Sequence, residues 1–194
     1  MSLRTRVESL LEQRRIGFVR TLDPDVLELS LDGDNASFLS YIFVAKPRRI
    51  ITIRTLVPLK TPDDKRSQVA ELLVRINAHL ELGHFEFSWR DGLIVCRTSI
   101  MLGTSKLHAD LLRHLLDANW WVCDRWFPAM RAVVVRNLTP EQAMQEITQQ
   151  LRLDDPEDMG GWLLSHPLAI ERAAAGGFRR QDTVVTLSDD DTPF

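Results

Sequence analysis

Two histidines and a glutamate lie close together where a long amphipathic stretch ends, and these residue types bind metal ions. His79 and His84 flank Glu81 in the segment NAHLELGH. A zinc site needs three or four converging ligands, and the sequence offers neither an HExxH pattern nor a thiolate before Cys96. Because the helix dipole favours a histidine near a helix C-terminus, we interpret both as helix-terminal or surface groups. The sequence predicts no metal site.

The candidates for nucleophilic catalysis and phosphate binding are isolated from one another. No serine lies in a GxSxG pattern, and Cys96 belongs to an alternating, strand-like segment, which is typical of a packed thiol. The two glycine pairs lack the preceding strand and the following Lys-Ser or Lys-Thr of a phosphate-binding loop. His108 and His114 are six residues apart and do not share a helix face. We therefore expect no catalytic residue and no cofactor.

Aromatic side chains recur at every second position in HFEFSWR. Phe85, Phe87 and Trp89 would point to one side of a strand. We expect the first two beneath helices and Trp89 at the tip of a hairpin, where it is less covered. Trp120 and Trp121 are adjacent on an expected helix and point about 100° apart, so both are buried only if that helix is enclosed.

Core packing is the first interpretation of each indole, and a partner surface is the alternative. Burying an indole and its surroundings, ~200 Å² of surface, contributes on the order of 5 kcal/mol. This free energy favours binding of a partner wherever the fold leaves an indole exposed. The candidate partner-binding residues are Trp89, Arg90 and Arg97 on the hairpin and Trp120, Trp121 and Trp126 on the long helix.

Periodicity and turn residues predict the elements that hold these side chains. Residues 3–15 have helical spacing, and three strand-like runs follow, VLELSL, SFLSYIFVA and RRIITIRTLVPL. The short connections predict an antiparallel meander. A helix is expected to begin at Thr61 as its cap, and Gly83 ends it.

The second half of the chain starts with a predicted hairpin, HFEFSWR and LIVCRTSIML, joined at Asp91-Gly92. A long helix is expected from about Ser105, with Pro128 kinking or stopping it, and MRAVVV is ambiguous between helix and strand. The capping box at 139–142 opens a further helix.

The composition of the chain limits the classes of partner that we expect it to bind. The chain has 194 residues, 44% of them hydrophobic, and a net charge of −3, so nothing attracts it generally to nucleic acid or anionic lipid. Charge is uneven: residues 141–194 carry 4 Arg and 11 Asp or Glu, a net −7, which leaves +4 for residues 1–140. With two cysteines and no apolar run of ~18 residues, we expect a cytoplasmic protein with reduced thiols and no membrane span.

The order of elements and several motifs resemble the YbjN-like bacterial family. The resemblance rests on VAELLVRINAHLELGHFEFSWRDGLIVCRTSIML, DRWFPAMRAVVV and TPEQAMQEI. Its specific parts are Asn77, the Leu-Gly-x-Phe-x-Phe segment, the Asp-Gly hairpin and the Asp-x-x-x-Pro element from Asp124 to Pro128. The resemblance, over roughly residues 3–150, implies the fold of type III secretion chaperones and a small noncatalytic sensory regulator. Relatives by fold are homodimers that hold a segment of a client protein.

We therefore predict an α+β fold, α-β-β-β-α-β-β-α, with an antiparallel sheet packed by helices and a C-terminal helical extension. The expected parts are a domain over 1–151, a short helical extension over 152–177 and an acidic, mobile tail over 178–194. The expected function is that of a noncatalytic adaptor or regulator, a homodimer that binds an unknown protein partner. The alternatives are a structural subunit that docks through its C-terminal segment, and a small-ligand sensor or unrecognised enzyme.

Overall fold

The computed structural model describes residues 1–154, and of residues 150–154 the backbone only. Most of the predicted extension over 152–177 and all of the predicted tail over 178–194 lie outside the described residues. In chain order the elements are α1 (Leu3–Gln13), β1 (Val19–Arg20), β2 (Val26–Asp32), β3 (Ser37–Ala45), β4 (Ile50–Leu56), the 3-10 helix η1 (Asp63–Lys65), α2 (Arg66–Asn77), β5 (His84–Phe87), β6 (Ile94–Met101), α3 (Ala109–Val135) and α4 (Pro140–Asp154).

The strands form one antiparallel sheet in the order β1-β2-β3-β4-β6-β5. The predicted meander is confirmed, since β2 pairs with β3 and β3 with β4. The predicted hairpin of β5 and β6 is also confirmed, and β6 joins it to the meander through β4. The structure adds the two-residue strand β1, which pairs with β2. The sequence did not predict β1, because two residues are too few to show an alternating pattern. The α+β class is confirmed.

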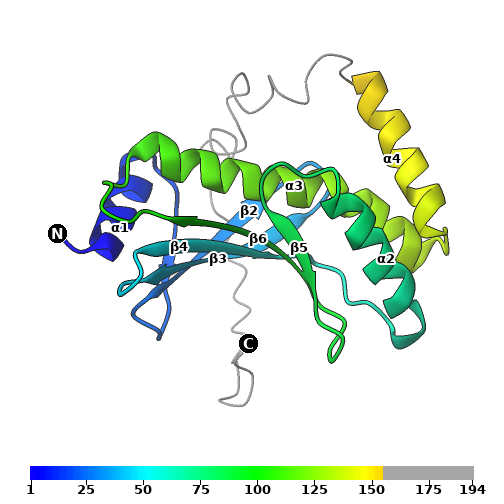
Figure 1. Ribbon diagram of the computed structural model, residues 1–194, viewed down its shortest axis with the longest axis horizontal. Helices are drawn as coiled ribbons and strands as arrows, with labels where there is room; N and C mark the ends of the chain where they lie inside the picture. The colour runs from blue at the N-terminus through cyan, green and yellow to red at the C-terminus, as the bar shows by residue number, and fades with distance from the viewer. Residues whose placement is uncertain (155–194) are drawn as a thin grey trace.

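Helices α1, α3 and α2 lie along one face of this sheet, and α4 packs against α2 and α3 at one end (Figure 1). The core between the layers has two halves. In one half α1 and the start of α3 cover the meander, where Leu10, Leu29 and Ile53 are buried. In the other half α2, α4 and the end of α3 cover the hairpin. The 27 residues of α3 give it a length of ~40 Å, enough to connect both halves.

The start of α2 differs from the prediction. Thr61 does not cap the helix; a 3-10 turn precedes α2, and Pro62 occupies the cap position of that turn. The backbone N–H of Thr61 donates to the Gly92 carbonyl at 3.0 Å, so Thr61 holds the β5–β6 connection instead. Gly92 has a φ of +72°, and a Cβ at this position would lie 2.2 Å from the Thr61 carbonyl oxygen. Only glycine fits this contact without strain.

Pro128 lies inside α3, which continues to Val135, so the predicted stop is wrong, and MRAVVV is helical. Proline has no N–H, so the carbonyl of Asp124, four residues earlier, loses its donor within the helix. The Asn35 side chain supplies one, because its Nδ2 donates to that carbonyl at 3.0 Å. The Asp124 carboxylate in turn accepts the backbone N–H groups of Asp34, at 3.1 Å, and Asn35, at 2.8 Å. The Asp-x-x-x-Pro element is thus a clamp that fixes the β2–β3 turn to α3.

A buried polar group on α3 fixes its position over the sheet. Asn119, with no exposed surface, accepts from the Thr55 hydroxyl at 2.5 Å and donates to the Thr98 hydroxyl at 3.0 Å and the Cys96 carbonyl at 3.2 Å. Thr55 also contacts Ser40 at 2.6 Å. Because a buried amide without partners is costly, sliding α3 along the sheet would break this network.

Asp117, two residues away on α3, has a different environment. Its side chain is 2% exposed and lies 3.5 Å from Arg113 Nη1. Neither carboxylate oxygen has a hydrogen-bond partner among the described residues. Burial raises the pKa of Asp117 to about 7, although the charges of Arg113 and Arg14 act in the opposite direction.

Candidate functional site

The face of the sheet opposite the helices is not covered by any element within residues 1–154 (Figure 1). Along β3, β4 and β6, buried residues that face the helices alternate with half-buried or exposed residues that face away. We call the second set the open face. Its members on these three strands are Ser37, Leu39, Tyr41, Phe43, Ala45, Ile50, Thr52, Arg54, Leu56, Val95, Arg97, Ser99 and Met101.

A row of charged and aromatic side chains crosses the open face. The strand register places Glu28 opposite Tyr41, Tyr41 opposite Arg54, Arg54 opposite Arg97, and Arg97 opposite His84. Directly opposed residues on one face have Cβ atoms about 5 Å apart. The row therefore runs over five strands, with two arginines side by side near its middle.

One carboxylate serves both arginines. Glu86 accepts from Arg97 Nη1 at 3.0 Å, and Arg54 Nη2 lies 3.8 Å from its other oxygen. Burial alone would raise the pKa of Glu86, but the Arg97 hydrogen bond and the charges of Arg54 and Arg97 outweigh it, and the pKa is lowered. Glu86 is thus ionised at neutral pH. Among the described residues it is the carboxylate that the two guanidinium groups share, whereas Glu28, the other carboxylate of the row, lies on β2 opposite Tyr41.

Aromatic side chains adjoin the arginines. The Arg54 guanidinium lies 5.6 Å from the centroid of the Phe43 ring, within cation–π range, and the rings of Phe43 and Tyr41 are 6.5 Å apart. Burial, reinforced by Glu28, raises the pKa of Tyr41 to about 12, so its hydroxyl remains a neutral donor. Tyrosine, phenylalanine and arginine are enriched in protein–protein interfaces.

The outer edge of the sheet is closed at β5 by the Asn77 side chain. Asn77 Oδ1 accepts the backbone N–H of Phe85 at 2.8 Å, and its Nδ2 donates to the Phe85 carbonyl at 3.0 Å. These are the two backbone groups that an added strand would pair with at this position. A partner strand therefore cannot extend the sheet at Phe85 without displacing Asn77.

The β5–β6 hairpin carries two of the predicted partner-binding residues. Trp89 is 57% exposed and stacks edge-on against Phe87, with centroids 5.3 Å apart. Arg90 is exposed, and Arg66 at the start of α2 binds the carbonyls of Trp89 at 2.7 Å and Arg90 at 3.4 Å. The hairpin tip is therefore anchored, with its indole facing outward.

The predicted residues on the long helix do not form one surface with the hairpin. Trp120 is 3% exposed and donates to Ser40 Oγ at 2.8 Å, and Trp126 is 5% exposed in the core. Trp121 is half-buried, with the Arg125 guanidinium 5.5 Å from its ring centroid. Of the six predicted residues, Arg97 alone belongs to the open face, and the structure brings it together with Arg54.

Sequence reasoning did not select Arg54, Tyr41 or Phe43. Their alternation with buried residues in SFLSYIFVA and IITIRTL places them on one face of a strand, and this signal was present in the sequence. What the alternation does not give is the strand order. Arg54 and Arg97 are 43 residues apart in the chain and become neighbours only because β4 pairs with β6.

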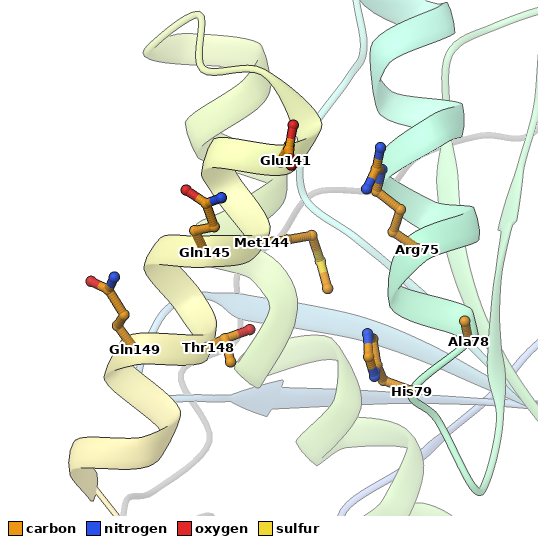
Figure 2. A pocket seen from close by; sticks show the side chains of 8 residues that line it. All are labelled: Arg75, Ala78, His79, Glu141, Met144, Gln145, Thr148 and Gln149. Atoms are coloured by element: carbon orange, nitrogen blue, oxygen red, sulfur yellow. The ribbon is translucent and has the colours of Figure 1, made fainter.

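A groove of about 520 Å³ lies between α2 and α4. Figure 2 shows Arg75 and His79 approaching it from the α2 side and Met144 pointing across from α4, whereas Gln145 points away. Arg75 is already held by Glu71, with Nη2 at 2.7 Å from the carboxylate. We interpret the groove as the seam between two packed helices, because its polar groups do not converge on a common point.

Residues 1–154 show neither the features of a metal site nor those of a membrane span. Within them no three His, Cys, Asp or Glu side chains come together as a metal site would require. His84 instead lies 3.3 Å from Glu86. Cys96 and Cys123 are free thiols with no exposed surface. No helix in this range is long and apolar enough to cross a bilayer.

Two solved structures are similar to this chain. A chain in the crystal structure of the ExsC-ExsE complex is 20% identical, with a TM-score of 0.48, over 66% of this chain and 95% of that one. YbjN from E. coli is 12% identical, with a TM-score of 0.44, over 77% of this chain and 91% of that one. No curated protein matches significantly. The sequence model of YbjN, described as "Putative bacterial sensory transduction regulator", matches residues 3–132. Since this match spans more than half of the chain, the chain belongs to the YbjN family.

Proposed function

We propose that the protein is a noncatalytic regulator or adaptor that binds a segment of a partner protein on the open face. The observation that carries the proposal is the side of the sheet that no element within residues 1–154 covers, where half-buried aromatic and aliphatic side chains surround Arg54 and Arg97. An antiparallel sheet with one wet face normally presents polar side chains there. Apolar side chains beside two arginines instead provide affinity and orientation for a polypeptide. Membership of a family described as a sensory regulator supports the same class of function.

The mode of binding that we propose is docking on the face of the sheet. Addition of a strand at β5 is disfavoured, because Asn77 already occupies the N–H and carbonyl of Phe85. At the other edge, β1 is only two residues long. The arginine pair adds a preference for a carboxylate on the partner, since a guanidinium binds a carboxylate with two hydrogen bonds. The partner segment is therefore apolar with at least one acidic residue.

Site-specific photo-cross-linking in cells tests the proposal. One cross-linker replaces Met101 on the open face, which is 67% exposed, and the control replaces Val74 on α2, which is 69% exposed. The proposal expects a discrete protein partner from position 101 only. Arg97→Glu should reduce this product, whereas Arg75→Glu, on the opposite side, should not. Equal capture at both positions, or no change with Arg97→Glu, would contradict the proposal.

The hairpin tip provides a second exposed contact outside the open face. We propose Trp89 and Arg90 as auxiliary contacts, because the indole is exposed and its backbone is fixed by Arg66. Trp89→Ala should weaken binding of the identified partner segment by about tenfold, the loss expected for one exposed aromatic anchor. Isothermal titration with the purified segment measures this loss.

We also propose that the protein forms a homodimer. Light scattering of the purified chain over a range of concentrations, with and without the partner segment, distinguishes a dimer from a monomer. If a dimer forms through the open face, Arg97→Glu dissociates it. In that case the second copy competes with the partner segment for the same surface.

A further inference from the structure

The open face has an electrostatic counterpart within the chain itself. At its centre Arg54 and Arg97 share Glu86 as their carboxylate partner. The β3–β4 turn adds Arg48, which is exposed, at the end of the same strands. Opposite charge is concentrated in the last 14 residues, 181–194, which contain four Asp and no Lys or Arg.

The same terminal segment matches the apolar part of the open face. The run TVVTL at 183–187 combines β-branched residues with a leucine, and the chain ends at Phe194. Such residues favour an extended backbone. Three consecutive acidic residues, Asp189, Asp190 and Asp191, follow this run after Ser188. Apolar side chains next to carboxylates are the chemistry that the arginines and aromatic rings of the open face would bind.

The length of the connection permits this contact. Helix α4 ends at Asp154, and 26 residues, 155–180, separate it from the terminal segment. A chain of this length can span up to ~85 Å. The longest helix of the fold, α3, is ~40 Å long, so the open face lies within reach. Tethering also gives such a segment an effective concentration on the order of millimolar, so even a weak contact is populated.

We propose that residues 181–194 bind the open face of their own chain and that a partner segment must displace them. This proposal rests on the proposed function for its regulatory meaning, because the terminal segment competes for the surface assigned to the partner. The full-length chain would then bind its partner with lower affinity than a chain whose open face is unoccupied. Neutralising the three consecutive aspartates would release the surface.

A spin label on the terminal segment tests the contact in the full-length chain. Cys96 and Cys123 are buried and do not react with the spin label. The label is therefore attached to the cysteine that Ser188→Cys introduces. Methionine methyl groups report the location of the label by paramagnetic broadening. Met101 lies on the open face, and Met144 lies in the groove between α2 and α4. We expect Met101 to be broadened several-fold more strongly than Met144.

Charge variants and isotope mixing make the result specific. With Asp189→Asn, Asp190→Asn and Asp191→Asn combined in the labelled chain, the broadening of Met101 should fall at least threefold. A mixture of spin-labelled chains with separate, methyl-labelled chains separates binding within a chain from binding between chains. The proposal expects no broadening of Met101 in the mixture. Broadening only in the mixture, equal broadening of Met101 and Met144, or no effect of the charge variants would overturn it.

The regulatory consequence is measured separately. In the cross-linking assay at position 101, the triple aspartate variant should raise partner capture by about tenfold, as expected when a bound competitor is removed. If partner capture occurs but Met101 shows no broadening by the label, the proposed function stands and the present proposal fails. If the label broadens Met101 but no partner is captured in any variant, the proposed function fails while the intramolecular contact stands.

Discussion

Replacing Asn77 with alanine removes a side chain that closes the exposed edge of β5. The substitution deletes two hydrogen bonds, from the Phe85 N–H at 2.8 Å and to the Phe85 carbonyl at 3.0 Å. Each such bond contributes about 1 kcal/mol, and leaving a partly buried partner unsatisfied costs a similar amount or more. Because water reaches this edge in part, we expect a total loss of about 2 kcal/mol in the free energy of unfolding. For a chain of this size that corresponds to a fall in Tm of about 4–8 °C.

Two measurements separate loss of stability from opening of the edge. Urea denaturation gives the loss in free energy, and hydrogen exchange at the Phe85 amide reports the local hydrogen bond. The amide of Phe85 should exchange at least about tenfold faster in Asn77→Ala, because its acceptor is gone. Light scattering should show concentration-dependent association, since an unpaired edge recruits other strands.

Asn77→Asp is the matched control. It retains an acceptor for the Phe85 N–H but removes the donor to the Phe85 carbonyl, so the amide should stay protected while stability falls by an intermediate amount. Ser67→Ala, at an exposed position on the same helix, should change neither quantity. An unchanged exchange rate at Phe85 in Asn77→Ala, or a loss below about 0.5 kcal/mol, would refute the assignment of Asn77 as the closure of this edge.

Three further predictions concern α3. Asp124→Ala should lower the free energy of unfolding by about 2 kcal/mol, because two backbone N–H groups of the β2–β3 turn lose a charged acceptor. An unchanged midpoint of urea denaturation would contradict the role of Asp124 as a clamp. Asn119→Ala should cost about 3 kcal/mol, since it removes the hydrogen bonds that Asn119 makes to the Thr55 and Thr98 hydroxyls and to the Cys96 carbonyl in the core, and calorimetry measures this as a lower Tm. Asp117 has a folded-state pKa of about 7 against an ordinary value of 3.8, so the folded state binds its proton more tightly and stability falls as pH rises between these values. Asp117→Asn should therefore match the wild type near pH 4 and be more stable above pH 7, by up to ~4 kcal/mol; parallel stability curves across this range would exclude the effect.

The residues that carry the family resemblance are explained by the structure as architectural contacts. Asn77 closes the edge of β5, and the Asp124 to Pro128 element clamps the β2–β3 turn. Gly92 allows the Thr61 carbonyl to approach the hairpin. These contacts hold elements of the fold together, which is why the motifs predicted the fold and did not point to a particular chemical activity.

Some local predictions failed for reasons that lie outside the local sequence. Thr61 has the residue type of a helix cap, but its N–H is engaged by the hairpin more than 30 positions later. Pro128 has the chemistry of a helix breaker, but Asn35 on a distant turn satisfies the carbonyl that proline leaves without a donor. In both positions a contact distant in sequence outweighs the local preference.

Two local signals in the sequence, the alternation of side chains along β3, β4 and β6 and the Asp-Gly turn, were sufficient to predict the strands and the α+β class. They also predicted the antiparallel pairing within the meander and within the hairpin. These features depend on neighbours a few residues apart in the chain. The tertiary structure alone decided which strands from the two groups meet. Pairing of β4 with β6 joined them and placed Arg54 beside Arg97 with Glu86 between them. The same packing enclosed Trp120 and Trp126, since α3 lies flat on the sheet, and no helix within residues 1–154 covers the opposite face. A surface built from five strands depends on how they are ordered in space, and periodicity within each strand carries no information about that order.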